Sequence, residues 1–280
     1  MTLEKEPQAY TEKTGLMEEK ACTEDIKLVN FGFQKVPETE KASRVRDHFD
    51  HIAGRYDFMN TLCSFGIHYL WKRMAVALLN LKQGETVLDV CGGTGDLSVL
   101  AVNKVGPFGR VILADINHAM IEAGRRKRLH REQRKKIVYL QSDTENMAIQ
   151  SDSVDAVMVG FGIRNLTHME RGFGEIYRVL KPGGRLMCLE FSRPRAAWFR
   201  WLYDFYSFHI MPYVGLIFAG SKQPFTYLPQ SIRRFPGPQE LKEHIAGIGF
   251  ERVSYEIFTN GIAAAHMGIK PGRAGHLPPA

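Results

Sequence analysis

Hydrophobic and polar positions along the chain predict strands and helices in turn. Segments with helical spacing of apolar residues separate five short apolar runs, at residues 85–91, 110–115, 136–143, 154–162 and 185–192. Strands that alternate with helices of this length predict a parallel sheet covered by helices on both faces. The expected fold class is therefore α/β.

The ends of the chain depart from this alternation. Residues 1–40 are rich in Glu, Lys and Thr and poor in large apolar residues, which predicts a mostly flexible tail. A second tail is expected over residues 271–280. Ser43 is the expected N-cap of the first helix, because a helical pattern of apolar residues follows it. One domain is therefore expected over residues 41–270.

The alternation also stops over residues 193–238. This stretch is heavily aromatic, which predicts an inserted helical cap rather than a linker. A helix is expected over 238–248, and two strand-like runs follow at 251–258 and 262–270. The Thr-Asn-Gly sequence between these two runs predicts a hairpin.

Composition narrows the class of protein. The chain has 280 residues, a formal charge of +7, 44% hydrophobic and 24% charged residues, which is ordinary for a soluble globular protein. Its four cysteines form no CxxC pair, so we expect no metal site and a reducing, cytoplasmic compartment. No apolar signal segment and no run of about 18 uncharged apolar residues occurs, so no secretory signal or membrane-spanning helix is expected.

A glycine-rich loop follows the first strand, and ligands bind at this edge in doubly wound folds. Asp115 ends the next strand, where its carboxylate can accept hydrogen bonds from both ribose hydroxyls of an adenosine. Ser98 replaces the third glycine of the dinucleotide fingerprint, and the P-loop lysine is missing. The predicted cofactor is therefore a phosphate-free nucleoside, S-adenosylmethionine. The loop residues expected to bind it are Gly92, Gly93, Thr94 and Gly95.

Carboxylates near the loop extend the predicted site. Asp89 and Asp96 flank it, and they suit the cationic methionine end of this cofactor better than a pyrophosphate. Asp143 and Thr144 follow the third strand at the same edge, where methyltransferases of this architecture hydrogen-bond the adenine amino group. Asp143 fits a helix N-cap equally well, and the two roles are compatible.

The chain resembles the C-methyltransferases of ubiquinone and menaquinone biosynthesis over roughly residues 31–270. The resemblance is carried by VLDVCGGTGD, VILADIN, FGIRN, RVLKPGGRLMCLEFS, YDFMN and SFGIHYLWKR. It implies a seven-stranded, Rossmann-like class I methyltransferase sheet whose last strand is antiparallel. The cofactor contacts that it implies are Thr94, Asp115, Asp143, Thr144 and, through its backbone, Gly160, where relatives often have Ser.

The resemblance also implies a reaction at a ring carbon of a polyprenylated quinol, without a metal. Such a carbon becomes nucleophilic when the ring hydroxyl is at least partly ionised, so the enzyme must stabilise a phenolate. Arg164 and Asn165 follow the fourth strand and Tyr56 lies in the N-terminal helices, which makes these three the candidate catalytic residues. Arg164 is expected to hold the anion rather than act as a base, because its pKa is above about 12. A structural salt bridge is the alternative role for Arg164.

Two segments of the chain indicate which partners the protein could bind. The aromatic segment 196–227 suits a polyprenyl tail and a membrane interface, which predicts a peripheral contact with the inner face of the membrane; ordinary packing of cap helices is the alternative. The basic segment 125–136 suits anionic lipid, nucleic acid or a solvated helix face.

The expected function is methyl transfer to demethylmenaquinol, to 2-methoxy-6-polyprenyl-1,4-benzoquinol, or to both. An RNA methyltransferase is one alternative, but FGIRN stands in place of the Asn/Asp-Pro-Pro-aromatic motif of amino-group methylation, so no nucleic-acid partner is expected. A non-catalytic subunit of a quinone-synthesis complex is another. The choice between the two quinols stays open, as does a homodimer.

Overall fold

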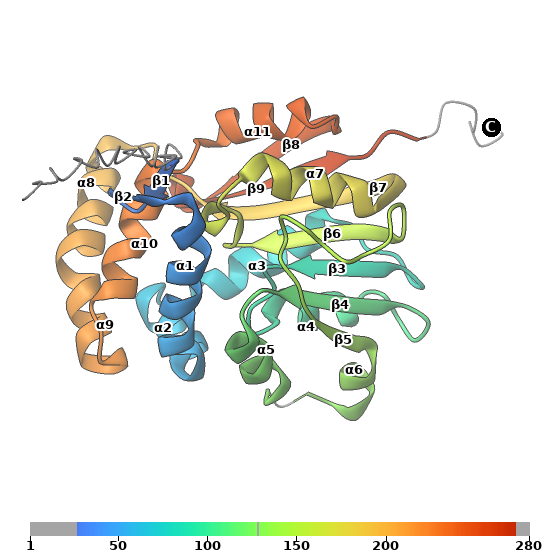
Figure 1. Cartoon of the computed structure of the whole chain (residues 1–280), viewed down its shortest axis with the longest axis horizontal. Helices are drawn as coiled ribbons and strands as arrows, with labels where there is room; N and C mark the ends of the chain where they lie inside the picture. Colours follow the sequence, from blue (N-terminus) through green and yellow to red (C-terminus); the bar gives the residue numbers. More distant parts are fainter. Residues whose placement is uncertain (1–26, 128, 273–280) are drawn as a thin grey trace, which may run out of the picture.

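A seven-stranded sheet forms the centre of the protein in the computed structural model, which describes residues 27–127 and 129–272 (Figure 1). The strand order is β5-β4-β3-β6-β7-β9-β8, and β9 runs antiparallel to both of its neighbours, whereas the remaining pairs are parallel. The strands are β3 (Thr86–Val90), β4 (Arg110–Asp115), β5 (Ile137–Gln141), β6 (Val154–Gly160), β7 (Leu180–Phe191), β8 (Glu251–Phe258) and β9 (Ala263–Ile269). The predicted fold class, with its antiparallel last strand, is confirmed.

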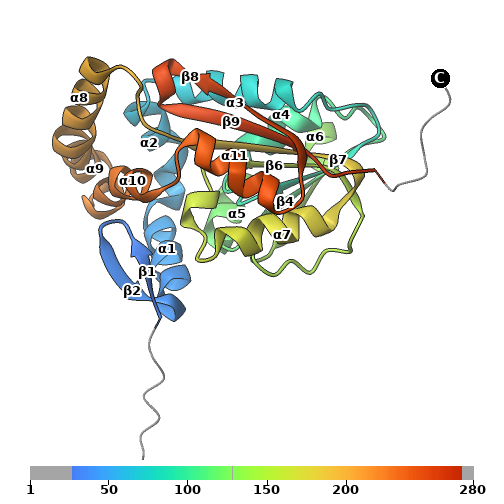
Figure 2. The same cartoon turned by 90° about the horizontal axis from the view of Figure 1, so that it is seen from above.

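Helices cover both faces of the sheet (Figure 2). One face packs against α3 (Ile67–Leu78), α4 (Asp96–Val102) and α5 (His118–Arg125). The other packs against α7 (Met169–Val179) and α11 (Pro238–Gly247). Both faces of the central strands are therefore buried, which explains why these strands read as continuous apolar runs in the sequence.

Side chains of each central strand divide between the two core layers by their alternation. In β3, Val87 faces the first layer, whereas Leu88 and Val90 face the second. In β7, Met187 joins the first layer and Leu186 the second, and all five of these side chains are fully buried. This rigid sheet fixes the strand ends that carry the candidate site.

The N-terminal region differs from the expected tail over residues 1–40. Residues 1–26 lie outside the described part of the chain, but β1 (Leu28–Phe31) and β2 (Gln34–Pro37) form an antiparallel hairpin. The hairpin is stabilised because Phe31 stacks on Tyr227, with ring centroids 4.6 Å apart, a contact that local composition does not reveal.

The first helix, α1 (Glu38–Ile52), begins before the predicted N-cap at Ser43. Ser43 lies inside this helix, where its hydroxyl donates to the carbonyl of Glu40. Pro37 precedes the helix instead and has an extended conformation that lets the chain turn out of the hairpin. A 3-10 turn (Ala53–Arg55) and α2 (Tyr56–Cys63) continue the helical N-terminal region.

Two local features of the structure differ from what their sequences favour. The basic segment 125–136 does not form one helix, because α5 ends at Arg125 and α6 (Arg131–Lys136) begins separately. The KPGG sequence at 181–184 is not a turn before a strand; it lies within β7, next to an irregularity in the pairing with β6. Gly183 has a φ of +79° there, a conformation that glycine adopts without strain.

The stretch 193–238 forms helices beyond the end of the sheet. A π-helical turn (Tyr206–Ile210) joins α8 (Ala197–Phe205) to α9 (Met211–Ala219), and α10 (Gln223–Arg234) follows. Figure 1 shows these helices at one end of the molecule, beyond the strand ends, with α1 and α2 beside them. Among the described residues, no helix has both the length and the apolar character needed to cross a membrane. The C-terminal residues 273–280 lie outside the described part.

Candidate active site

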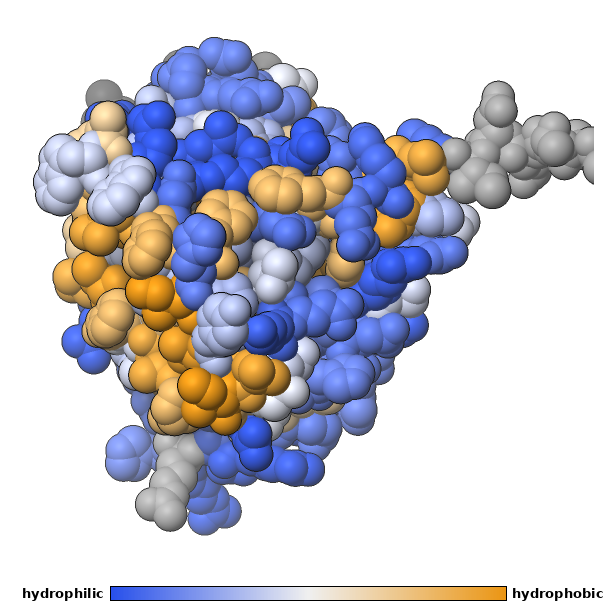
Figure 3. All heavy atoms as spheres, turned by 90° about the vertical axis from the view of Figure 1, so that its left-hand side faces the viewer, coloured by the Kyte–Doolittle hydropathy of each residue, from blue (hydrophilic) through white to orange (hydrophobic). Residues whose placement is uncertain are grey.

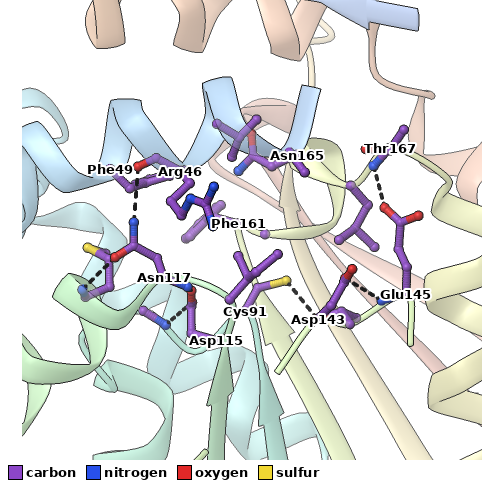
Figure 4. Close-up of a pocket in the computed structure, with 18 of the residues that line it drawn as sticks. Arg46, Phe49, Cys91, Asp115, Asn117, Asp143, Glu145, Phe161, Asn165 and Thr167 are labelled. Carbon is purple, nitrogen blue, oxygen red and sulfur yellow. Dashed lines mark hydrogen bonds between the residues drawn. The ribbon is translucent and has the colours of Figure 1, made fainter. Parts of the chain in front are cut away.

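A cavity opens at the carboxyl ends of β3, β4, β5 and β6 (Figure 4). Helix α1 and the start of α2 cover it from the opposite side through Val45, Arg46, Phe49 and Tyr56. The candidate cofactor and substrate side chains therefore meet between the sheet edge and the N-terminal helices.

Backbone strain marks the sheet side of this cavity. Cys91 after β3 and Phe161 after β6 have φ values of +51° and +61°, which non-glycine residues rarely adopt. The two loops touch, because a Cβ atom added to Gly162 would overlap that of Cys91. Strained residues persist where the surrounding structure holds them, and they cluster at functional sites.

Asp115 closes one wall of the cavity at the end of β4. Its Oδ2 accepts from the backbone N–H of Gly93 and its Oδ1 from that of Asn117, both at 2.8 Å. Burial raises the pKa of Asp115, and these backbone donors oppose that shift. Each carboxylate oxygen has a second lone pair, so Asp115 can still accept two further hydrogen bonds.

The opposite wall comes from the loop after β5. Asp143 lies on it and accepts from the backbone N–H of Glu145 at 2.9 Å, as Figure 4 shows. The neighbouring Thr144 is buried, with its hydroxyl 3.4 Å from the Cys91 sulfur. Burial raises the pKa of the Cys91 thiol, so this thiol stays protonated and packs rather than acting as a nucleophile.

The end of β6 supplies Gly160 and Asn165 to the cavity wall. A Cβ atom at Gly160 would lie 2.8 Å from Leu97 Cδ1, so a larger residue there would have to displace the leucine. The Asn165 side-chain oxygen accepts from the Tyr227 hydroxyl at 3.1 Å, which ties this wall to helix α10.

Arg164 does not line the cavity. Its guanidinium forms a buried ion pair with Glu190, at 2.9 Å, and also donates to the carbonyl of Phe161. Both side chains are less than a tenth exposed. The structure therefore shows the alternative that the sequence left open for Arg164, a structural salt bridge, and this bridge fixes the strained turn that carries Asn165.

Four residues of the predicted cofactor site are also absent from the lining of this cavity. Gly92 and Gly95 shape the loop from behind, since a Cβ atom at either would lie 2.8 Å from Leu113. The Thr94 hydroxyl is buried and donates to Asp57 at 2.6 Å. Asp89 is 1% exposed, and one of its oxygens has no hydrogen-bond partner among the described residues.

Asp96 does not face the cavity and is neutralised by two lysines. It forms ion pairs with Lys72, at 2.7 Å, and with Lys127, which also pairs with Asp57 at 2.8 Å. Although burial opposes the shift, the two lysines hold the pKa of Asp96 well below its usual range. The cluster joins the glycine loop to α2 and α3, so Asp96 stabilises the loop rather than a cationic ligand.

The sequence analysis missed several lining residues. Arg46 and Phe49 lie on α1, and the backbone carbonyl of Arg46 accepts from the Asn117 side chain at 3.1 Å. Phe49 belongs to the helical pattern of apolar residues that follows Ser43, but no pattern in the sequence indicates that this face of the helix covers a ligand site. Asn117 is the N-cap of α5. The sequence indicates this role, because an Asn directly after a strand and before a helix is a typical N-cap. Glu145 accepts from the backbone N–H groups of Thr167 and His168.

The sheet and its flanking helices define the class I methyltransferase fold. A SAM dependent methyltransferase from Aquifex aeolicus is similar, with a TM-score of 0.50 and 18% identity over 71% of this chain and 88% of that one. The cyclase SpnF has a TM-score of 0.60 and 14% identity over 82% of this chain and 96% of its own. These likenesses show the fold alone, because proteins with one fold carry out different reactions.

Sequence relatives narrow the class to one family. The model of the ubiE/COQ5 methyltransferase family matches residues 34–270. A protein of Methylococcus capsulatus named ubiquinone/menaquinone biosynthesis C-methyltransferase UbiE is 45% identical over 241 residues, 86% of this chain and 97% of the relative. The protein of the same name from Stutzerimonas stutzeri is 44% identical over 242 residues, 86% and 94%. The chain belongs to the ubiE/COQ5 methyltransferase family and is therefore a methyltransferase.

Proposed function

We propose that this protein transfers a methyl group from S-adenosylmethionine to a ring carbon of a polyprenylated quinol in menaquinone or ubiquinone biosynthesis. The observation that carries the proposal is the cavity that places Asp115 and Asp143 on the sheet side and Asn165 and Tyr56 nearby. The relatives named for this C-methylation support the substrate class.

The residues of the cavity fit S-adenosylmethionine. Asp115 has acceptor capacity for ribose hydroxyls, and Asp143 lies where an adenine amino group can be bound. Arg46 is the only Lys or Arg among the described residues that line the cavity, which makes it the partner for the carboxylate of the methionine end. The cofactor, when bound, supplies a methyl group that its sulfonium has already activated.

The protein's own contribution to the reaction is to position the quinol and stabilise its phenolate. Asn165 lies on the cavity wall, and its side-chain oxygen accepts from Tyr227, so its amide N–H₂ group is the donor for the quinol oxygen. Tyr56 lines the same cavity from α2. Arg164 acts from behind this wall, where it holds the turn at Phe161 and adds positive charge that Glu190 largely balances.

The basic segment gives less support to the RNA alternative. Arg125 pairs with Glu122 and Lys135 with Glu132, each at 2.9 Å, as on an ordinary solvated helix face. We also propose a peripheral contact with lipid at the inner face of the membrane, because the polyprenyl tail of the substrate partitions into the bilayer.

The test of the function is methyl transfer by purified protein to reduced, short-tailed demethylmenaquinol and to the matching benzoquinol, followed by mass spectrometry. We expect product from at least one quinol, and the ratio of the two rates assigns the branch. Quinones that accumulate in a strain lacking the protein give the same assignment independently. Binding of nicotinamide nucleotides without binding of S-adenosylmethionine or its demethylated product would overturn the proposal.

Asp115→Ala tests the cofactor site directly. Two charge-assisted hydrogen bonds of about 1.5–3 kcal/mol each predict at least about 100-fold weaker binding of S-adenosylhomocysteine, measured by titration calorimetry. Glu251→Ala removes an exposed carboxylate at the start of β8 and serves as the control, with unchanged affinity expected.

A further inference from the structure

The helical segment from α8 through α9 carries a long apolar stripe on its outer face. Figure 3 shows hydrophobic residues gathered on this side of the molecule. Trp198, Trp201 and Ile217 are 71%, 70% and 73% exposed. The stripe consists of Trp198, Trp201, Leu202, Phe205, Ile210, Tyr213, Leu216 and Ile217. Such a continuous exposed stripe of large apolar side chains marks an interaction surface.

The π-helical turn keeps this stripe on one face. Members of the stripe follow helical spacing up to Phe205 and again from Ile210 onward, but the step from Phe205 to Ile210 is five positions. In a continuous α-helix, a step of five residues rotates the side-chain direction around the helix axis by about 500°. Ile210 and the residues after it would then point about 140° away from Phe205. The π turn takes up the extra residue at Tyr206–Ile210, because it has more residues per turn. The exposed face therefore stays continuous over the whole segment.

Neighbouring elements extend the same surface. Phe58 of α2 contacts Phe218 of α9, with ring centroids 6.1 Å apart, and is 55% exposed. Phe65, at the turn after α2, is 83% exposed and lies 5.8 Å from the Tyr206 ring. We call the stripe together with these two phenylalanines the cap face. Because α2 also brings Tyr56 to the cavity, the cap face lies on the covering side of the active site.

The charges around the cap face have one sign. Residues 51–73 and 191–237, which form it and flank it in the chain, contain nine Lys or Arg and two Asp, with no Glu. Both aspartates are paired, Asp57 with Lys127 and Asp204 with Arg233. Exposed cations therefore border an apolar face that lacks a free carboxylate.

We infer that the cap face is the surface by which the protein docks onto an anionic lipid bilayer to take up its polyprenylated substrate. Tryptophan and tyrosine side chains suit the bilayer interface, and each basic residue near an anionic surface adds attraction. A second copy of the chain fits poorly, because a symmetric contact would set cations against cations. The inference rests on the proposed function for its substrate, whereas binding to lipid tests the surface by itself.

The experiment is flotation of the full chain with vesicles of phosphatidylcholine alone or mixed with phosphatidylglycerol. We expect binding to the anionic vesicles, weakened by salt. The double variant Trp201→Ser/Ile217→Ser should bind at least about tenfold more weakly, because both side chains lose apolar contact with lipid. Phe108→Ser, which removes an 89% exposed side chain from the loop before β4, is the matched control and should bind like the unchanged protein.

Charge and fluorescence give independent readouts. Arg195→Gln/Lys222→Gln should lower affinity for anionic vesicles more than Arg131→Gln/Lys135→Gln on α6, which lies beside the edge strand β5, away from α8 and α9 (Figure 1). Trp71 is buried, so a shift of tryptophan emission to shorter wavelength on vesicle binding reports Trp198 and Trp201. Unchanged emission with bound vesicles would overturn the assignment of this face.

Two further outcomes separate the inference from its alternatives. If the protein is a dimer that Trp201→Ser/Ile217→Ser converts to a monomer, and it binds no vesicles, the cap face is a self-association surface and the inference is wrong. Methyl transfer to a soluble, short-tailed quinol should be unchanged in that double variant, whereas transfer to a long-tailed quinol in vesicles should fall. If the unchanged protein transfers no methyl group to either quinol, the result instead contradicts the proposed function.

Discussion

The two sides of the active-site cavity are stabilised in different ways. On the sheet side, charged groups are buried or largely buried and are paired, as with Arg164 and Glu190 or Asp96 and its two lysines. On the cap side, large apolar residues of α8 and α9 face solvent, and charges border them. The first arrangement fixes the loops around the cavity in one geometry, whereas the second leaves a large apolar surface exposed.

This difference predicts where substitutions cost stability. Removing one member of a buried ion pair leaves an uncompensated charge, which destabilises a protein by about 3–5 kcal/mol. Changing an exposed residue usually alters stability by less than about 0.5 kcal/mol. The following variants test whether the two sides of the molecule follow these two regimes.

Arg164→Ala should have the largest effect, because it leaves Glu190 buried at 1% exposure without its partner. We expect a loss of about 3–5 kcal/mol in the free energy of unfolding, measured by urea denaturation. The double variant Arg164→Met/Glu190→Gln should recover at least half of that loss, since it removes both charges. If Arg164→Ala unfolds at the same urea concentration as the unchanged protein, the ion pair does not stabilise the sheet side.

The same variants separate the structural role of Arg164 from its role in the reaction. Turnover should be lost in both, because the turn that carries Asn165 is no longer fixed, while affinity for S-adenosylhomocysteine should persist in the more stable double variant. Near-normal turnover in the double variant would contradict the role proposed for Arg164.

Asp96→Ala should destabilise the protein by about 3 kcal/mol. Lys72, whose side chain is 9% exposed, would lose its partner at 2.7 Å, although Lys127 would keep Asp57. Glu132→Ala breaks the exposed pair with Lys135 and is the matched control, with an expected change under about 0.5 kcal/mol. Equal changes in the two variants would contradict the difference between buried and exposed pairs.

Asp89→Asn should change how stability depends on pH. Burial raises the pKa of Asp89 from 3.8 to about 7, so the folded protein favours the protonated carboxyl more than the unfolded chain does. Its contribution is therefore complete below about pH 4 and is lost as the pH rises through about 7. Urea denaturation at pH 5 and pH 8 should show that Asp89→Asn removes about 1–3 kcal/mol of this decline. Glu256→Gln, at an exposed position in β8, should leave the decline unchanged.

Trp201→Ala should have the smallest effect, under about 0.5 kcal/mol, because the side chain is 70% exposed. Trp71→Ala provides the contrast within the same residue type. Trp71 is 2% exposed and donates from its ring nitrogen to Thr259 at 2.9 Å, so its loss should cost about 3–5 kcal/mol. Thermal unfolding of both variants measures the difference, and a large loss for Trp201→Ala would mean that the cap face is covered in the native protein.

The sequence by itself determined the sheet and one wall of the site. The apolar runs predicted the central strands because burial on both faces removes polar residues from them. The glycine loop and Asp115 could be placed together, because parallel strands end at one edge of the sheet. The structure joins them through the hydrogen bond from Gly93 to Asp115.

Only the tertiary structure decided the roles that depend on distant partners. Phe31 belongs to an ordered hairpin because it stacks on Tyr227. Arg164 lies outside the cavity because it forms an ion pair with Glu190. Spacing also could not separate Phe225, which is buried, from Trp201, which is exposed, within one aromatic stretch. Periodicity identifies side chains that share a face, but what that face meets depends on the packing of segments far apart in the chain.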